Sequence, residues 1–118
     1  MAITINTQSK DFSEVEQYLM TLDRGIKSLK DVEDNTSISV AGYLTFTDEK
    51  DNGDSVDILS IITLDNEVFS CQSATFKRSF DNITNIMHGK QFSIIKVSGT
   101  TKAGRSYIDC ALDVKSVK

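Results

Sequence analysis

Apolar and polar residues alternate through the middle of the chain, which is the pattern of half-buried β-strands. In the segment SISVAGYLTF, apolar residues and one glycine occupy every second position from Ile38 to Phe46, and Tyr43 is the one large residue on the other side. Turn signals at Asn52-Gly53 and Asp65-Asn66 separate this segment from two further apolar runs. The pattern therefore predicts a meander of three strands, over residues 37–46, 56–64 and 67–71.

Two other stretches have apolar residues at helical spacing. We expect an amphipathic helix over residues 74–88, which ends before Gly89, and a shorter helix over residues 12–23, which ends before Gly25. Residues suited to cap their first turns are Ser9 or Asp11 for the shorter helix and Ser73 or Thr75 for the longer one. The faces expected to pack in the core are Phe12, Val15, Leu19 and Leu22 in the shorter helix, and Phe76, Phe80, Ile83 and Met87 in the longer one.

The last part of the chain predicts a basic hairpin. Two strand-like runs, residues 91–98 and 105–114, enclose the segment GTTKAGRS, which differs by one residue from the phosphate-binding P-loop pattern. Arg105 stands where the P-loop has its lysine, and the residues that follow alternate as a strand instead of opening a helix. We therefore expect a hairpin with Lys102 and Arg105 at its tip, and no nucleotide-binding loop.

The order of the predicted elements suggests a fold. Three strands, a helix and two strands form the layout of the OB-fold, a five-stranded antiparallel barrel with one helix between strands 3 and 4. The sequence predicts a mainly β protein (β with minor α) of this type, folded as one domain over residues 1–118 with a helical extension over residues 1–30. Residues 26–35 fit either a loop or an edge strand.

Composition sets limits on the location of the protein and on its cysteine chemistry. No apolar run reaches the roughly eighteen residues of a membrane span, and the N-terminal MAITINTQSK lacks the layout of a signal peptide, so we expect a cytoplasmic protein. Cys71 and Cys110 lack C-x-x-C spacing, and each lies in a strand-like segment. Free buried thiols are therefore favoured over a metal site or a disulfide.

No group of residues has the spacing typical of an enzyme or of a metal site. His88, the single histidine, lies in the last turn of the longer helix, where a cap or surface role is favoured over that of a base. The carboxylates lack the paired spacing of a metal-dependent nuclease. The acidic turn DEKDNGDS would place Lys50 and Leu59 at ligand positions of a calcium-binding EF-hand loop. We therefore expect no enzymatic activity, no cofactor and no metal.

Charge is unevenly distributed along this acidic protein, whose formal net charge is −4. Residues 1–34 contain four Lys or Arg against seven Asp or Glu, and residues 35–73 contain one against seven. Residues 74–118 contain eight against three. Because the local electrostatic field governs binding more than the total charge does, the C-terminal part is a candidate surface for a polyanion.

Single-stranded nucleic acids are bound by aromatic platforms for the bases and by cations along the phosphates. Tyr43 and Tyr107 fall on the polar sides of their strands, where their rings are expected to face outward. Lys96 on the fourth strand and Lys102 and Arg105 at the hairpin tip are expected near Tyr107. The alternative is that both tyrosines are ordinary half-exposed strand residues, which β-propensity also favours.

The chain also resembles a known family, the single-stranded DNA-binding proteins of phi-29-type phages, which copy linear genomes by protein priming and strand displacement. The resemblance covers residues 28–114 and lies in the order of elements, in the short aromatic strand DNEVFS before the helix ATFKRSFDNITNIM, and in the Gly-Thr-x-x-x-Gly hairpin. It implies an OB-type fold and base stacking at Tyr43, Phe69 and Tyr107, although Phe69 lies in a strand too short for its face to be assigned. It further implies sequence-independent binding during phage DNA replication in the bacterial cytoplasm, with phage replication proteins as further candidate partners.

The N-terminal segment departs from the family, and the final DVKSVK lacks the acidic tail through which bacterial single-strand binders recruit partners. We therefore expect such recruitment to be absent or to work differently. The second hypothesis for the whole chain is an acidic protein-interaction module, such as a phage-encoded inhibitor or DNA mimic that acts on a host protein.

Overall fold

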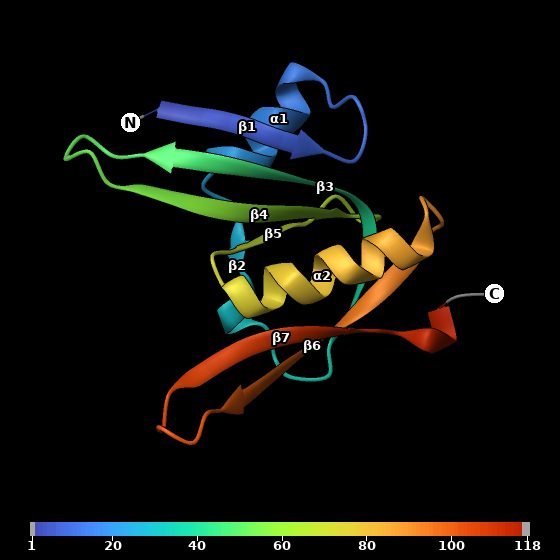
Figure 1. Ribbon diagram of the computed structural model, residues 1–118. Coiled ribbons are helices and arrows are strands. Elements are labelled where there is room, and N and C mark those ends of the chain that lie inside the picture. Colours follow the sequence, from blue (N-terminus) through green and yellow to red (C-terminus); the bar gives the residue numbers. More distant parts are fainter. Residues whose placement is uncertain (1, 117–118) are drawn as a thin grey trace.

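The computed structural model describes residues 2–116 and is mainly β, with one curled sheet and two helices (Figure 1). The elements are β1 (Ala2–Gln8), α1 (Glu14–Thr21), β2 (Lys27–Ser28), the 3-10 turn η1 (Leu29–Asp31), β3 (Ser37–Glu49), β4 (Ser55–Thr63), β5 (Val68–Cys71), α2 (Ala74–Met87), β6 (Phe92–Thr100), β7 (Ser106–Leu112) and the 3-10 turn η2 (Val114–Ser116). No helix in this part of the chain is long and apolar enough to span a membrane.

The sheet has the strand order β2-β5-β4-β3-β6-β7, and β1 pairs with the end of β3. The expected succession of three strands, a helix and two strands is confirmed by β3, β4, β5, α2, β6 and β7. The expected count of five antiparallel strands is too low, because β1 and β2 also join the sheet and β2 runs parallel to β5. The N-terminal segment therefore contains strands as well as the expected helix.

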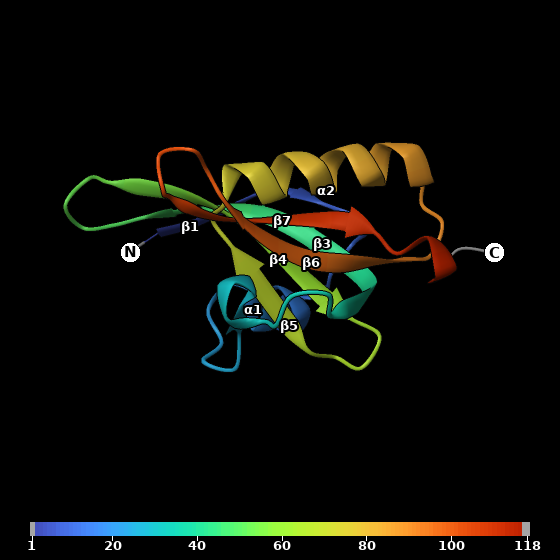
Figure 2. The same cartoon turned by 90° about the horizontal axis from the view of Figure 1, so that it is seen from below.

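Two hydrophobic clusters lie on opposite faces of this sheet. The α2-side cluster consists of Leu29, Ile38, Val40, Leu59, Ile61, Phe69, Cys71, Phe76, Phe80, Met87, Phe92, Ile94, Ile108 and Cys110. The α1-side cluster consists of Phe12, Met20, Leu44, Phe46, Ile62 and Val68. Figure 2 shows α2 along one side of the curled sheet and α1 on the other, so each helix covers its own face.

A register shift in β3 changes which of its residues face each cluster. The pairing with β4 is regular on either side of a bulge between Val40 and Gly42. Because an extra residue reverses the side-chain alternation, Val40 packs in the α2-side cluster and Leu44 packs in the α1-side cluster. Tyr43 consequently faces α2, where its ring contacts Phe80 edge-on with centroids 5.0 Å apart.

Helix α1 is shorter than expected, and a different face of it packs against the sheet. Ser13 caps it, since its hydroxyl accepts the amide of Glu16 and the Glu16 carboxylate accepts the amide of Ser13. Starting the helix after Ser13 leaves Phe12 outside it and directs Met20 into the core. The predicted caps are therefore wrong, and of the predicted core residues Phe12 is buried whereas Val15, Leu19 and Leu22 are exposed.

Helix α2 follows the sequence pattern closely. Ser73 caps its first turn, Phe76, Phe80 and Met87 are buried, and Ile83 is half-buried against them. His88 ends the helix in the left-handed conformation, with a φ of 50°. The expected cap role of this histidine is confirmed.

Candidate nucleic-acid interface

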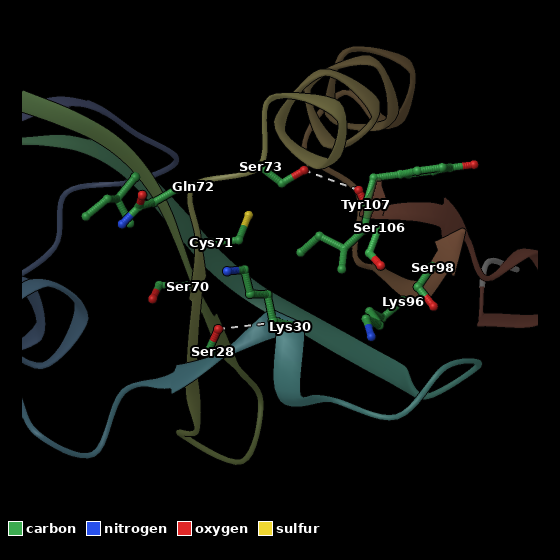
Figure 3. Close-up of a pocket in the computed structure, with 12 residues that line it drawn as sticks. Ser28, Lys30, Ser70, Cys71, Gln72, Ser73, Lys96, Ser98, Ser106 and Tyr107 are labelled. Carbon is green, nitrogen blue, oxygen red and sulfur yellow. Dashed lines mark hydrogen bonds between the residues drawn. The ribbon is translucent and has the colours of Figure 1, made fainter. Parts of the chain in front are cut away.

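A groove separates β5 from β7. In the described sheet β5 pairs with β4 and β2, and β7 pairs with β6 alone, so the curled sheet stays open between these two strands. The Ser73 hydroxyl spans one end of the opening and donates to the Ile108 carbonyl at 3.2 Å. The groove has a volume of about 820 Å³ and is lined by Ser28, Lys30, Ile58, Ser70, Cys71, Gln72, Ser73, Lys96, Ser98, Ser106, Tyr107 and Ile108 (Figure 3).

The walls of the groove carry mostly groups that donate hydrogen bonds. Five of the lining residues are serines, and Gln72, Lys30 and Lys96 add an amide and two ammonium groups. None of the described residues that line it is an aspartate or a glutamate. Hydroxyl, amide and ammonium groups are the donors that phosphate oxygens accept from proteins, so the lining suits an anionic chain.

Lys30 is the cation of this groove that remains exposed. It lies on η1, and Figure 3 shows its side chain extending between the walls. The Ser28 hydroxyl fixes this turn by accepting the amide of Lys30 at 3.3 Å. Lys30 forms no ion pair with any other residue of the part of the chain that the structure describes.

Lys96 also lines the groove, but its charge is already paired. Only 4% of the residue is exposed, and its Nζ donates to the Val32 carbonyl at 2.7 Å and to Asp34 Oδ1 at 3.1 Å. The other Asp34 oxygen accepts the Ser98 hydroxyl at 2.5 Å. The hydrogen bond from Ser98, together with the Lys96 ammonium, lowers the pKa of Asp34 below its ordinary value. Lys96 is therefore not the free strand cation that the sequence predicted.

Lys102 and Arg105 are exposed at the tip of the β6–β7 hairpin, as expected. The turn is closed by hydrogen bonds from the Thr101 amide to the Arg105 carbonyl and from the Arg105 amide to the Thr101 hydroxyl. Gly104 takes a φ of +84°, which favours glycine at that position. Two cations are thus held on a hydrogen-bonded turn beside the groove.

Tyr107 lies on the outer face of the same hairpin. Its partner across the strands is Gly99, and the tyrosine ring rests on that glycine, leaving 39% of the residue exposed. Ile108, the next residue, is buried in the α2-side cluster, so the ring of Tyr107 points away from the β5 wall (Figure 3). Lys96 lies opposite Cys110 and shares the inner face with Ile108. The expected juxtaposition of Lys96 and Tyr107 is therefore wrong, because the two side chains lie on opposite faces.

Tyr43 and Phe69 do not line the groove. Tyr43 is half-buried against Phe80, which corrects the expectation that its ring faces outward. Phe69 is 9% exposed in the α2-side cluster, and Lys27 Nζ lies 5.7 Å from its ring centroid. Of the six predicted site residues, Lys102, Arg105 and Tyr107 lie together at the outer end of the hairpin, and Lys96 lies on its inner face. Tyr43 and Phe69 lie elsewhere.

The β2–η1 wall of the groove was missed by sequence reasoning. Lys30, Ser28 and Ser70 meet the hairpin because β2 pairs in parallel with β5, at Lys27 with Phe69 and at Ser28 with Ser70. A two-residue parallel pair leaves no periodic signal in the sequence. The serine two positions before Lys30 is a turn signal that could have fixed its local structure, but not its partner.

The two cysteines are free and buried, which confirms that prediction. Desolvation by burial raises the pKa of Cys71 to about 11 and that of Cys110 to about 12. Both thiols therefore stay protonated at neutral pH, where only the thiolate reacts as a nucleophile. Within residues 2–116, no group of three or more His, Cys, Asp or Glu side chains is placed to hold a metal ion.

Comparisons of the chain with models of protein families, with curated proteins and with solved structures found no significant match.

Proposed function

We propose that this protein binds single-stranded DNA without sequence preference, along the groove between β5 and β7 and across the β6–β7 hairpin. The observation that carries the proposal is the lining of the groove, which combines Lys30 with five serines, contains no described carboxylate, and continues toward Lys102 and Arg105 at the hairpin tip. A single strand presents both its phosphates and its unpaired bases, so a groove with this lining beside an exposed tyrosine ring favours the single strand over a duplex.

We infer that β3 to β7 and α2 correspond to an OB-type barrel that is left open between β5 and β7. Three features support this: the meander of β3, β4 and β5, the pairing of β3 with both β4 and β6, and the position of α2 between β5 and β6 in the chain. Proteins of this fold commonly hold oligonucleotides across one face of the barrel. The fold alone does not assign the function, so the proposal rests on the groove.

Each group has a defined role in the proposed complex. Lys30, Lys102 and Arg105 contact phosphates and release counterions, while the hydroxyls of Ser28, Ser70 and Ser106 donate hydrogen bonds to phosphate oxygens. The Tyr107 ring offers a base a stacking surface, which tolerates any sequence because every base has a flat aromatic face. The resemblance to the phage proteins supports a role in protecting displaced single strands during DNA replication.

Titration with oligo(dT) and with a duplex of the same length tests the proposal. The chain has three tyrosines and no tryptophan, so tyrosine fluorescence reports on stacking. We expect quenching by oligo(dT) at micromolar protein and low salt, and weaker binding of the duplex. Absence of quenching and of a gel shift with the single strand would refute the proposal. If immobilised protein retained a host protein but no oligo(dT), the acidic interaction module would be favoured instead.

A further inference from the structure

Helix α1 exposes a continuous apolar stripe. Four of the eight large hydrophobic residues that are exposed in the described part of the chain belong to this helix and its C-cap: Val15 (68%), Tyr18 (51%), Leu19 (37%) and Leu22 (49%). Their spacing is i, i+3, i+4 and i+7, which places them on one face of a helix. Exposed apolar residues that are gathered in this way mark an interaction surface more often than scattered ones do.

The stripe is not needed to hold the helix on the sheet. Met20 is fully buried in the α1-side cluster with Phe12, and the reciprocal hydrogen bonds of Ser13 and Glu16 fix the first turn. Figures 1 and 2 both show α1 on the side of the sheet away from α2. The helix is therefore formed before any partner binds, which lowers the entropy lost on association.

The border of the stripe is mainly acidic. Glu14 and Glu16 lie in the first turn of the helix, Asp11 precedes its N-cap and Asp23 follows its C-cap, against Lys10 and Arg24 in the same stretch. Residues 1–34 as a whole contain seven acidic and four basic side chains. Electrostatic complementarity therefore favours a partner whose contact surface is bordered by lysine or arginine.

A second copy of this chain fits the stripe poorly. Seven of the twelve residues that line the groove between β5 and β7 are serines or lysines, so this groove is a poor match for four apolar anchors. A helix of eight residues is about 12 Å long, so pairing two α1 helices would bury much less than the roughly 800 Å² per partner of a standard interface. Self-pairing would also bring two acidic borders together.

We propose that α1 is a helical docking element whose stripe inserts into an apolar groove, bordered by basic residues, on a partner protein. This role is separate from DNA binding, because the stripe and the groove between β5 and β7 share no lining residue. It would allow the protein to recruit another protein while the groove is occupied.

The test uses the full chain and a designed helical peptide of leucine and lysine, whose apolar face is bordered by lysines. Binding is followed by the NMR shifts of the α1 amides. We expect the double variant Val15→Ser/Leu22→Ser to bind the peptide at least about tenfold more weakly than the wild type. The control Ile86→Ser, which removes an apolar residue that is 72% exposed on α2, should bind normally. A matched leucine and glutamate peptide should not bind.

Three outcomes would overturn the proposal. The first is equal affinity of the wild type and the double variant for the leucine and lysine peptide. The second is equal binding of the leucine and glutamate peptide, because the acidic border would then play no part. The third is a dimer in sedimentation equilibrium that the double variant abolishes, because the stripe would then be covered by a second copy. Circular dichroism shows independently whether the variants are folded.

Discussion

Gly99 determines where the ring of Tyr107 lies. A Cβ atom on Gly99 would sit 2.5 Å from the tyrosine Oη and 2.6 Å from Cζ, both closer than atoms can approach. The ring can occupy its position on the outer face of the hairpin only because position 99 has no side chain. The ring thus lies against Gly99 of β6, while 39% of the residue stays exposed.

We expect Tyr107→Ala to weaken oligo(dT) binding by about one to two powers of ten, because stacking is worth roughly 1–3 kcal/mol per base. Tyr107→Phe should restore binding, since stacking uses the ring face. Gly99→Ala should weaken binding less than Tyr107→Ala does, by pushing the ring off the strand. Fluorescence titration measures all three. Wild-type affinity in Tyr107→Ala, with an unchanged unfolding midpoint, would remove this ring from the interface.

Lys96 and Lys102 should respond differently to substitution, although both are lysines of the same hairpin. The ammonium of Lys96 is buried and donates to Val32 and Asp34, so Lys96→Met should lower the free energy of unfolding by about 1.5–3 kcal/mol. It should leave the salt dependence of DNA binding unchanged. Lys102→Ala should leave stability unchanged and flatten the slope of log affinity against log salt by about 0.7. If Lys96→Met instead kept its stability and flattened the salt slope, Lys96 would contact the phosphates.

Asp34 makes the stability of this region depend on pH. Because its pKa is lowered in the folded state by the Ser98 hydroxyl and the Lys96 ammonium, its ionised form stabilises the fold above its unfolded pKa of about 3.9. That contribution is lost as the pH falls through the lower folded value. We expect the stability of the wild type to decrease more steeply below about pH 4 than that of Asp34→Asn. If the stability of the wild type and that of Asp34→Asn decreased equally steeply with falling pH, this prediction would be contradicted.

At the scale of elements, the bulge in β3 explains why Tyr43 was assigned to the wrong face. Without it, residues 38 to 46 would present one uninterrupted stripe to one core, as their alternation predicts. With it, Ile38 and Val40 pack on the α2 side and Leu44 and Phe46 on the α1 side. Local periodicity cannot reveal a bulge, because an extra residue changes the pairing with β4 but not the pattern within β3.

Tyr43→Ala should therefore lower the stability of the fold more than it lowers the affinity for DNA. Its ring is half-buried and packs edge-on against Phe80, so we expect a loss of about 2 kcal/mol in the free energy of unfolding, and a near-neutral effect of Tyr43→Phe. The affinity of the folded variant for oligo(dT) should change less than in Tyr107→Ala. A Tyr43→Ala variant that keeps its unfolding midpoint but loses DNA affinity would restore the outward assignment of this ring.

The parts of the fold that sequence patterns predicted are those set by local interactions. Alternation and turn residues located β3 to β7, and the spacing of Phe76, Phe80 and Met87 located α2 and its buried face. The basic tip with Lys102 and Arg105 followed from the hairpin. The parts that were missed depend on contacts between distant segments. These are the pairing of β1 with β3, the parallel β2–β5 pair that positions Lys30, and the docking of Met20 that sets the orientation of α1.

At the scale of the whole molecule, two surfaces of different chemistry lie on different elements. The groove between β5 and β7 and the basic hairpin tip suit a polyanion, and the apolar stripe of α1 with its acidic border suits a basic protein surface. The acidic residues of the β3–β4 turn lie on a separate hairpin from Lys102 and Arg105, so the overall charge of −4 does not prevent a local attraction of phosphates.

The most direct test compares the salt dependence of oligo(dT) binding in Lys30→Ala and Lys50→Ala. Both lysines are exposed, but Lys30 lines the groove and Lys50 lies at the β3–β4 turn. If the strand follows the groove, Lys30→Ala should flatten the slope of log affinity against log salt by about 0.7, and Lys50→Ala should leave it unchanged. A wild-type slope in Lys30→Ala, or an equal reduction in both variants, would contradict binding in the groove.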